Sequence, residues 1–597
     1  MNGDTPVSTP DYLDPSLTPA QRVADLLPRM TLEEKAGLLF HPATSLPEPG
    51  LTEAEALATA REDIADRFIS HFNVFNGADA AEIAAWSNTL QELAASTRLG
   101  IPITLSSDPR SGFHSTPFTG QTLDSLSRWP EHTGLGAIDD PEVARAYGDT
   151  IRREFLAMGL RVYLGPMADI FSEPRWTRGF GTFGEDVDVV SRLTAAFIEG
   201  LRGSAELSGE SVAAVVKHFP GGGPQLHGDD AHDSRHPEQV YPGGRQQLHL
   251  RPFEAAFGAG VTQLMTYYGM PVGTEWEERG FAFNRPVVKD LLRDHYGFTG
   301  IVVSDWNVID ATEIAGMPFG PNGYGLLDVT PTDRLQVALE VGVDQFGGDT
   351  CTERVVELVR DGRISEARID ESAARILNEK FALGLFEHRF VDVDAARAIG
   401  SDPALRARGE SAQAASLVLL ADEDALVPVA GGRRVYAEGI DWSTVSHDLV
   451  VADSPAEADL ALVRLDAPWQ SDPDSPLGDF FHGGSLEFPA ETVAQVAAIA
   501  EAVPTVVVVY LERPAVLTPL LPHAAALVAD FGASDQVVVD AVAGITGFAG
   551  RLPFDLPRSG AAVEASREDV PFDTEEPVFR HGDGIARTAR DEGRSAA

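Results

Sequence analysis

Short apolar segments recur along this chain, and several of them end abruptly in polar residues. The clearest is the run Ile301 to Val303, which follows glycines at 297 and 300 and is closed by Ser304-Asp305-Trp306. A β-branched run without polar alternation is typical of a strand buried on both faces, as in parallel sheets covered by helices. We therefore expect Asp305 at the carboxyl end of a buried strand.

Four other apolar segments show the same pattern. They cover residues 101–105, 160–164, 212–216 and 263–266, and the polar residues that follow them include Asp108, Asp169, Lys217-His218 and Tyr267-Tyr268. A lone strand-end Asp could simply cap the next helix. One ligand pocket at the rim of a (β/α) barrel explains all five strand ends together, because the loops after parallel strands gather there.

The segments between these runs carry helix signals. Asp140-Pro141 starts a predicted helix that Gly159 ends, and Thr31 with Glu34 forms a capping box. Helices are also predicted at Thr18-Pro19 and over 51–70, 80–96 (capped by Asp79) and 364–385. Strands that alternate with helices predict a parallel sheet with right-handed crossovers.

A second alternation begins after about residue 400. Apolar strands are predicted at 416–420, 459–465, 505–511 and 525–531, separated by alanine-rich helices such as 491–502. We predict a catalytic (β/α) barrel domain over 1–390, a linker over 391–409 and a smaller α/β domain over 410–557. Residues 558–597 are expected to pack back onto the molecule, with a disordered tail after about 587.

Composition narrows the classes of function. At 597 residues the chain is too long for one core, and 43% hydrophobic residues are ordinary for a globular protein. The 91 acidic and 46 basic side chains give a formal charge of -45. A surface so negative disfavours nucleic acid and anionic membranes as partners, and it favours a neutral or cationic small ligand.

Cysteine usage and hydropathy add two expectations. Cys351 is the single cysteine, so no intramolecular disulfide can form and no Cys-based metal site is expected. The first ten residues lack an apolar leader core, and no apolar run approaches 18 residues. These features predict a cytoplasmic protein, and a homodimer is left open.

Taken together, the motifs resemble those of glycoside hydrolase family 3. The resemblance covers the chain from about Leu17 to Ile585, and its specificity comes from the order of the motifs. They are Arg22-Val23-Ala24-Asp25-Leu26-Leu27, Met30-Thr31-Leu32-Glu33-Glu34-Lys35, Pro174-Arg175-Trp176 with Arg178, Gly184-Glu185-Asp186, Lys217-His218-Phe219, Gly297-Phe298-Thr299-Gly300, Ser304-Asp305-Trp306, Gly550-Arg551-Leu552-Pro553-Phe554, Glu576-Pro577-Val578-Phe579 and His581-Gly582-Asp583-Gly584.

This resemblance implies a (β/α)8-type (TIM-like) barrel followed by an α/β sandwich, and a retaining exo-acting β-glycosidase, foremost a β-glucosidase, that needs no cofactor. Carried over by motif, Asp305 is the nucleophile that forms a covalent glycosyl-enzyme. The residues implied to hold the terminal sugar are Asp108, Arg178, Lys217, His218, Tyr268 and Trp306. His114 stands where many relatives have an Arg, six residues after the first Asp, and is included with them.

The acid/base residue is left open by the sequence. Many two-domain relatives supply a Glu from the second domain, but the matching position here is Gln470, whose amide cannot act as the acid. Asp472, Asp474 and Asp479 in the same acidic loop are the candidates, and Glu487 is less favoured because it is expected on a solvated strand face.

Two further possibilities follow from the barrel loop over 223–236, which contains three His and three Asp. One family branch, the β-N-acetylhexosaminidases, uses an Asp-Ser-His arrangement there, and Asp233-Ser234-Arg235-His236 is similar with one extra residue. A β-N-acetylhexosaminidase or phosphorylase is therefore an alternative, as is a sugar-binding protein without an acid. A metal site in this loop is a weaker possibility, since its spacing does not converge ligands on one face.

Overall fold

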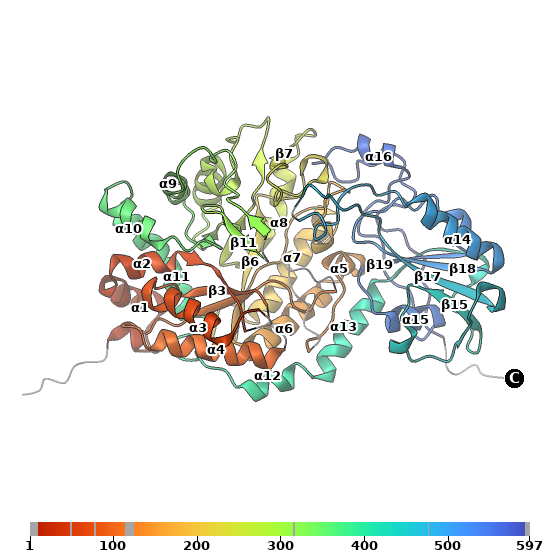
Figure 1. Cartoon of the computed structure of the whole chain (residues 1–597), viewed down its shortest axis with the longest axis horizontal. Coiled ribbons are helices and arrows are strands. Elements are labelled where there is room, and N and C mark those ends of the chain that lie inside the picture. The colour runs from red at the N-terminus through yellow and green to blue at the C-terminus, as the bar shows by residue number, and fades with distance from the viewer. Residues whose placement is uncertain are drawn as a thin grey trace, which may run out of the picture.

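The structure is a computed structural model, and it describes residues 10–47, 50–76, 79–113, 125–314, 317–475 and 477–590. Two bodies lie side by side in Figure 1: a larger one from the amino-terminal part of the chain, and a smaller one built around a second sheet. The predicted contact residue His114 lies outside the described residues.

Eight parallel strands close into a barrel in the larger body. Neighbouring strands pair in parallel from β2 through β10, Val303 pairs with Gln345, and β13 pairs with β1, which is separated from β2 by only Pro42. The (β/α)8-type barrel is thereby confirmed. The strands are β1 (Phe40–His41) with β2 (Ala43–Thr44), β3 (His71–Val74), β4 (Thr104–Ser107), β5 (Leu160–Tyr163), β6 (Ala213–Phe219), β8 (Gln263–Thr266), β10 (Ile301–Val303) and β13 (Phe346–Gly347).

Helices lie between successive strands, and several predicted caps form. Thr31 makes its capping box, Asp79 accepts from the N–H of Glu82, and Gly159 ends its helix in the left-handed conformation. The helix predicted over 51–70 ends sooner, because a π-turn over Glu62–Asp66 leads into β3. The helices are α1 (Pro19–Leu26), α2 (Leu32–Leu38), α3 (Glu53–Arg61), α4 (Ala80–Ala95), α5 (His132–Ile138), α6 (Pro141–Met158), α7 (Val187–Arg202), α8 (Gln246–Gly258), the π-helix Pro286–His295, α9 (Pro331–Val341), α10 (Thr352–Arg360) and α11 (Glu366–Ala382).

The smaller body is a three-layer α/β sandwich, as predicted. Helix α14 (Ala490–Ala502) packs on one face of its sheet and α15 (Asp535–Ala543) on the other (Figure 1). The strand order is β14-β19-β18-β17-β15-β16, and only β14 runs antiparallel to its neighbour. The strands are β14 (Val418–Asp422), β15 (Arg434–Glu438), β16 (Val450–Val451), β17 (Leu460–Asp466), β18 (Thr505–Tyr510) and β19 (Ala526–Asp530).

Strands β15 and β16 were not expected from the sequence, since β16 is exposed at the sheet edge and β15 beside it is only partly buried, so neither has a continuous apolar run. The segment predicted as a linker contains α12 (Val393–Ile399) and the start of α13 (Pro403–Ser416), and α12 contacts α4 and α6. Within the described residues, no helix has the length and apolar character needed to cross a bilayer.

The segment after residue 557, which includes α16 (Gly560–Ala565), contacts the loops that follow β5 and β6. The Glu185 carboxyl group accepts hydrogen bonds from the N–H of Asp555 (2.9 Å) and of Phe572 (2.5 Å). Asp569 accepts from the N–H of Gly243 and of Arg245, both at 2.7 Å. These contacts fix the second domain and the C-terminal segment over the carboxyl end of the barrel.

Glu185 should make stability depend on pH. Burial raises the pKa of its carboxyl from 4.5 to about 8 in the folded protein. Between these values the unfolded chain releases a proton that the folded protein keeps, so this group lowers the unfolding free energy as pH rises, by at most about 1.4 kcal/mol per pH unit. We expect Glu185→Gln to lose this dependence. The unfolding free energy of the variant should therefore rise relative to that of the parent protein as pH rises from 5 to 8.

Thermal unfolding of both proteins across this range measures the effect. The exposed Glu491→Gln is a matched control and should follow the parent protein. Parallel melting curves for the parent and Glu185→Gln would show that the buried carboxyl does not titrate in this window.

Candidate functional site

A cavity lies at the carboxyl end of the barrel strands, where the sequence predicts the site. Of the predicted residues, Asp108, Arg178, Lys217, His218, Tyr268, Asp305 and Trp306 all line it. Six lining residues were not predicted to bind the sugar: Asn73, Phe75, Leu164, His232, Met265 and Phe319. The barrel thus brings together side chains that are up to 246 positions apart in the chain, from Asn73 to Phe319.

Asp305 is the second residue after β10 and is 7% exposed. The N–H of Trp306 donates to Oδ1 at 2.8 Å. The other oxygen, Oδ2, is buried and has no hydrogen-bond donor among the described residues. A buried carboxylate oxygen without a donor is costly, so it marks a position where a ligand atom is expected.

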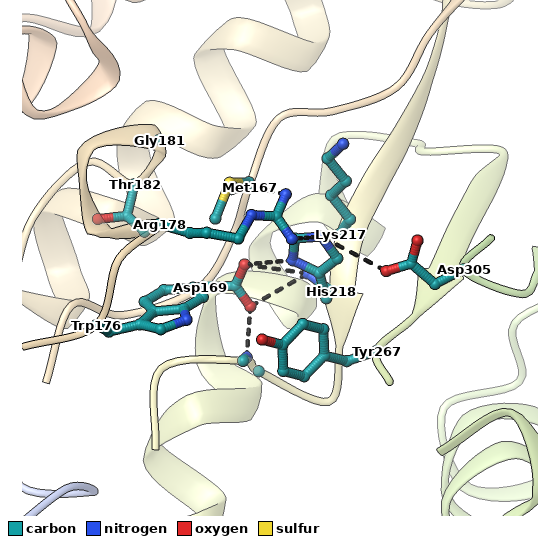
Figure 2. A network of polar contacts seen from close by, with 12 residues as sticks. Met167, Asp169, Trp176, Arg178, Gly181, Thr182, Lys217, His218, Tyr267 and Asp305 are labelled. Atoms are coloured by element: carbon teal, nitrogen blue, oxygen red, sulfur yellow. Dashed lines mark hydrogen bonds and ion pairs between the residues drawn. The ribbon is translucent and has the colours of Figure 1, made fainter. Parts of the chain in front are cut away.

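His218 faces Asp305 and is held from behind (Figure 2). Its Nδ1 donates to Asp169 Oδ2 at 2.9 Å, and its Nε2 lies 4.0 Å from Asp305 Oδ2. Arg178 Nη1, which can only donate, contacts the same Nε2 at 3.0 Å. Burial and the Arg178 charge lower the pKa of His218 to about 4, so the imidazole is neutral at ordinary pH.

Asp169 is the fixed point of this network. It is fully buried and accepts from the N–H of His218, at 3.1 Å, and of Gly222, at 2.5 Å, besides the imidazole. Burial opposes its ionisation, but His218 and these backbone donors lower the pKa of Asp169 below its usual value. An ionised acceptor here sets the ring orientation of His218.

Lys217 and Asp108 form a second polar pair in the cavity. Lys217 Nζ donates to Asp108 Oδ1 at 3.0 Å, and Asn73 Nδ2 approaches the other oxygen at 3.4 Å. Asn73 comes from β3, which the sequence reading did not identify as a strand. Within the described residues, Lys217 pairs with Asp108 and not with Asp169 or Glu185.

Aromatic groups form the remaining wall. Tyr268 Oη donates to the carbonyl of Trp306 at 2.8 Å, and burial with the nearby Asp305 charge raises the pKa of Tyr268 well above 10. The indole of Trp306 packs against His41, and Phe319 lies beside His232. Flat apolar groups next to hydrogen-bonding groups match the two kinds of surface that a pyranose presents.

The three carboxylates predicted as acid/base candidates do not line this cavity. Asp472 pairs with Arg235 at 2.5 Å, Asp474 donates its N–H to Asp472, and Asp479 accepts from Ser471. Gln470 pairs with Gly483 across a hairpin of the second domain. The acid/base role of these three Asp residues stays a prediction.

The histidine-rich barrel loop does not assemble a metal site in the part of the chain that is described. His236 lies 3.5 Å from Asp229, and Asp233 pairs with Arg235, so the ligands face different partners. No group of three His, Cys, Asp or Glu side chains that could hold a metal forms among the described residues.

Comparisons with known proteins agree with this geometry. Residues 31–379 match the model of the glycosyl hydrolase family 3 N terminal domain. β-Glucosidase C of Emericella nidulans is 42% identical over 581 residues, which are 96% of this chain and 94% of that protein. The periplasmic β-glucosidase/β-xylosidase of Dickeya chrysanthemi is 37% identical, over 96% of this chain and 91% of that protein.

Solved structures share the whole architecture. A β-glucosidase from Erythrobacter marinus superposes with a TM-score of 0.80, at 22% identity, over 97% of this chain and 84% of that chain. A mutant form of the exo-1,3/1,4-β-glucanase from a Pseudoalteromonas species gives a TM-score of 0.77 at 20% identity, covering 98% of both chains. At this identity the match shows the fold alone. Together with the family model and the closer relatives, the evidence shows that this chain belongs to glycosyl hydrolase family 3.

Proposed function

We propose that this protein is a retaining, exo-acting β-glucosidase in which Asp305 is the nucleophile. The observation that supports it best is the buried Oδ2 of Asp305, which has no donor among the described residues, on a side chain that lines a cavity ringed by hydrogen-bonding groups. A retaining glycosidase needs a carboxylate at this place to attack the anomeric carbon. The names of the relatives from Emericella nidulans and Dickeya chrysanthemi point to the same substrate class.

Recognition of a terminal sugar follows from the polar pairs. Asp108 accepts from hydroxyl groups while Lys217 and Arg178 donate to them, so one hydroxyl can bridge a cation and a carboxylate. Neutral His218 has its Nε2 occupied by Arg178 and its Nδ1 by Asp169, so it acts chiefly by holding the guanidinium in place. Because the cavity ends against the barrel core, it accommodates the end of a chain of sugars.

The first chemical step places positive charge on the sugar ring beside Asp305. Asp305 Oδ2 bonds to the anomeric carbon as the leaving oxygen departs and takes a proton from the enzyme's acid. In the second step water attacks the same carbon and releases the carboxylate, so configuration is retained. Burial alone would lower the pKa of Arg178, but the nearby carboxylates Asp230, Asp305 and Asp169 raise it and keep the guanidinium charged.

The role of Asp305 leads to a direct prediction. Asp305→Ala should reduce kcat/KM for nitrophenyl β-glucoside by at least about 1,000-fold, because it removes the nucleophile and not a binding contact. A 2-fluoro glucoside should label the parent protein at Asp305, and mass spectrometry of the digest locates the adduct. Activity within about tenfold of the parent, a barrier change of about 1.4 kcal/mol, would exclude this role. Nitrophenyl N-acetylglucosaminide, with and without phosphate, tests the two alternative activities in the same assay.

His218 provides a pH test of the site. With a pKa of about 4, the imidazole is already neutral at pH 5, and its charge does not change between pH 5 and pH 8. We expect His218→Gln to lower kcat/KM by about 10- to 100-fold, through misplacement of Arg178, without moving either limb of the pH profile in this range. Rate profiles of the two proteins measure this, and a limb present in the parent but absent in the variant would contradict it.

A further inference from the structure

A second histidine–carboxylate pair lies at the cavity, and neither of its groups transfers a proton or forms a bond in the steps above. His232 lines the same cavity as Asp305. Its Nδ1 contacts Asp230 Oδ1 at 2.5 Å, and its side chain is 8% exposed. No hydrogen bond to Nε2 forms among the described residues. The imidazole therefore has one nitrogen fixed by a carboxylate and the other free for a ligand.

Asp230 is held as firmly as Asp169. It accepts from Trp176 Nε1 at 3.1 Å, from Tyr267 Oη at 3.2 Å and from the N–H of His232 at 3.0 Å. Burial would raise the pKa of this carboxyl, but the charges of His232 and Arg178 lower it far below its usual value. An ionised carboxylate with three further donors gives the His232 ring one orientation and accepts its Nδ1 hydrogen.

The ring is also clamped by aromatic groups from three parts of the fold. The edge of Tyr268, after β8, packs on it with ring centres 4.8 Å apart, and Phe319 lies at 6.3 Å. Phe481, from the second-domain hairpin that contains Gln470, packs on the ring at 4.9 Å. The second domain thus contributes a wall beside His232, while its carboxylates Asp472, Asp474 and Asp479 stay outside the cavity.

We propose that His232, oriented by Asp230, is the acid/base residue of this enzyme. The inference rests on the proposed function, because it presumes attack by Asp305. It also gives the second-domain hairpin a positioning role toward His232, in place of the carboxylate that Gln470 cannot supply.

Asp305, His232 and water account for every bond and proton in the two steps. In the first step the bond from Asp305 Oδ2 to the anomeric carbon forms, the bond to the leaving oxygen breaks, and His232 Nε2–H gives its proton to that oxygen. In the second step neutral Nε2 takes a proton from water, whose oxygen bonds to the anomeric carbon as the ester to Asp305 breaks. Asp230 remains a carboxylate throughout and acts as a positioning residue.

The groups that surround the imidazole belong to the same cavity. The charged and titratable groups that face it are Asp230 on its own loop, Tyr268 after β8 and, across the cavity, Asp305, Arg178, Lys217, His218 and Asp108. His218 is neutral above about pH 4, so it does not compete for the acid role at ordinary pH.

The experiment compares leaving groups in full-length variants. His232→Ala should lose at least about 1,000-fold in kcat/KM on methyl β-glucoside, whose leaving group needs a proton, and less than about 30-fold on dinitrophenyl β-glucoside, whose leaving group does not. On the activated substrate the glycosyl-enzyme should accumulate, and azide should restore turnover and yield β-glucosyl azide. Asp230→Asn should show the same contrast at smaller amplitude.

The matched control is His236→Ala on the same loop, since His236 also lies beside an Asp but outside the cavity. It should behave like the parent protein. Equal losses of His232→Ala on both substrates with no azide product, or azide rescue of Asp472→Ala, Asp474→Ala or Asp479→Ala instead, would overturn the proposal.

Labelling by a 2-fluoro glucoside separates this inference from the proposed function. Absence of an adduct at Asp305 in the parent protein would defeat both. An adduct in the parent and in His232→Ala, without a leaving-group contrast, would defeat the role of His232 alone. His232→Gln, which keeps most of the ring's volume between Tyr268 and Phe481, repeats the test if the alanine variant unfolds.

Discussion

The buried carboxylate of Asp169 is the interaction on which the site depends. It joins the loop after β5 to the end of β6, because its hydrogen-bond donors among the described residues come from His218 and Gly222. With the imidazole fixed in this way, its other nitrogen faces Arg178, and the guanidinium is held beside the cavity. Removal of the Asp169 side chain would leave three buried donors without an acceptor, which costs more than any single contact of the cavity gains.

The same arrangement occurs a second time at Asp230 and His232. In both pairs a buried carboxylate accepts from an imidazole Nδ1 and from backbone N–H groups, so the ring has a single tautomer. The pairs differ in what meets Nε2. Arg178 occupies that atom in His218, whereas in His232 it meets the cavity. This difference makes one imidazole a support and leaves the other free to exchange a proton with a ligand.

The sequence predicted those features that a single strand or helix end determines. The buried run before Asp305 and the caps at Thr31, Asp79 and Gly159 are local, and each forms as expected. Features that depend on two distant segments were missed. The short strand β3, which supplies Asn73, has little apolar pattern of its own, and it becomes a strand because β2 and β4 flank it.

His232 was missed for a related reason. The sequence named six ionisable residues in its loop, but neighbours in a loop point in different directions, and no spacing rule says which one faces inward. Residues far away in the chain decide that His232 faces the cavity. Trp176 and Tyr267 hold Asp230, and Phe481 contacts the ring from the other domain.

The net charge of -45 has little effect on the electrostatics inside the cavity. Charges on the surface are screened over about 8 Å at physiological ionic strength, whereas Arg178 and Lys217 are buried within the cavity, at 4% and 7% exposure. Each cation there is matched by a nearby carboxylate, so the cavity offers paired donors and acceptors and no strong single charge. A neutral ligand rich in hydroxyl groups can satisfy both members of such pairs at once, but an ion would leave one member unmatched. Selection of a sugar therefore comes from local pairing inside the barrel and is independent of the acidic exterior.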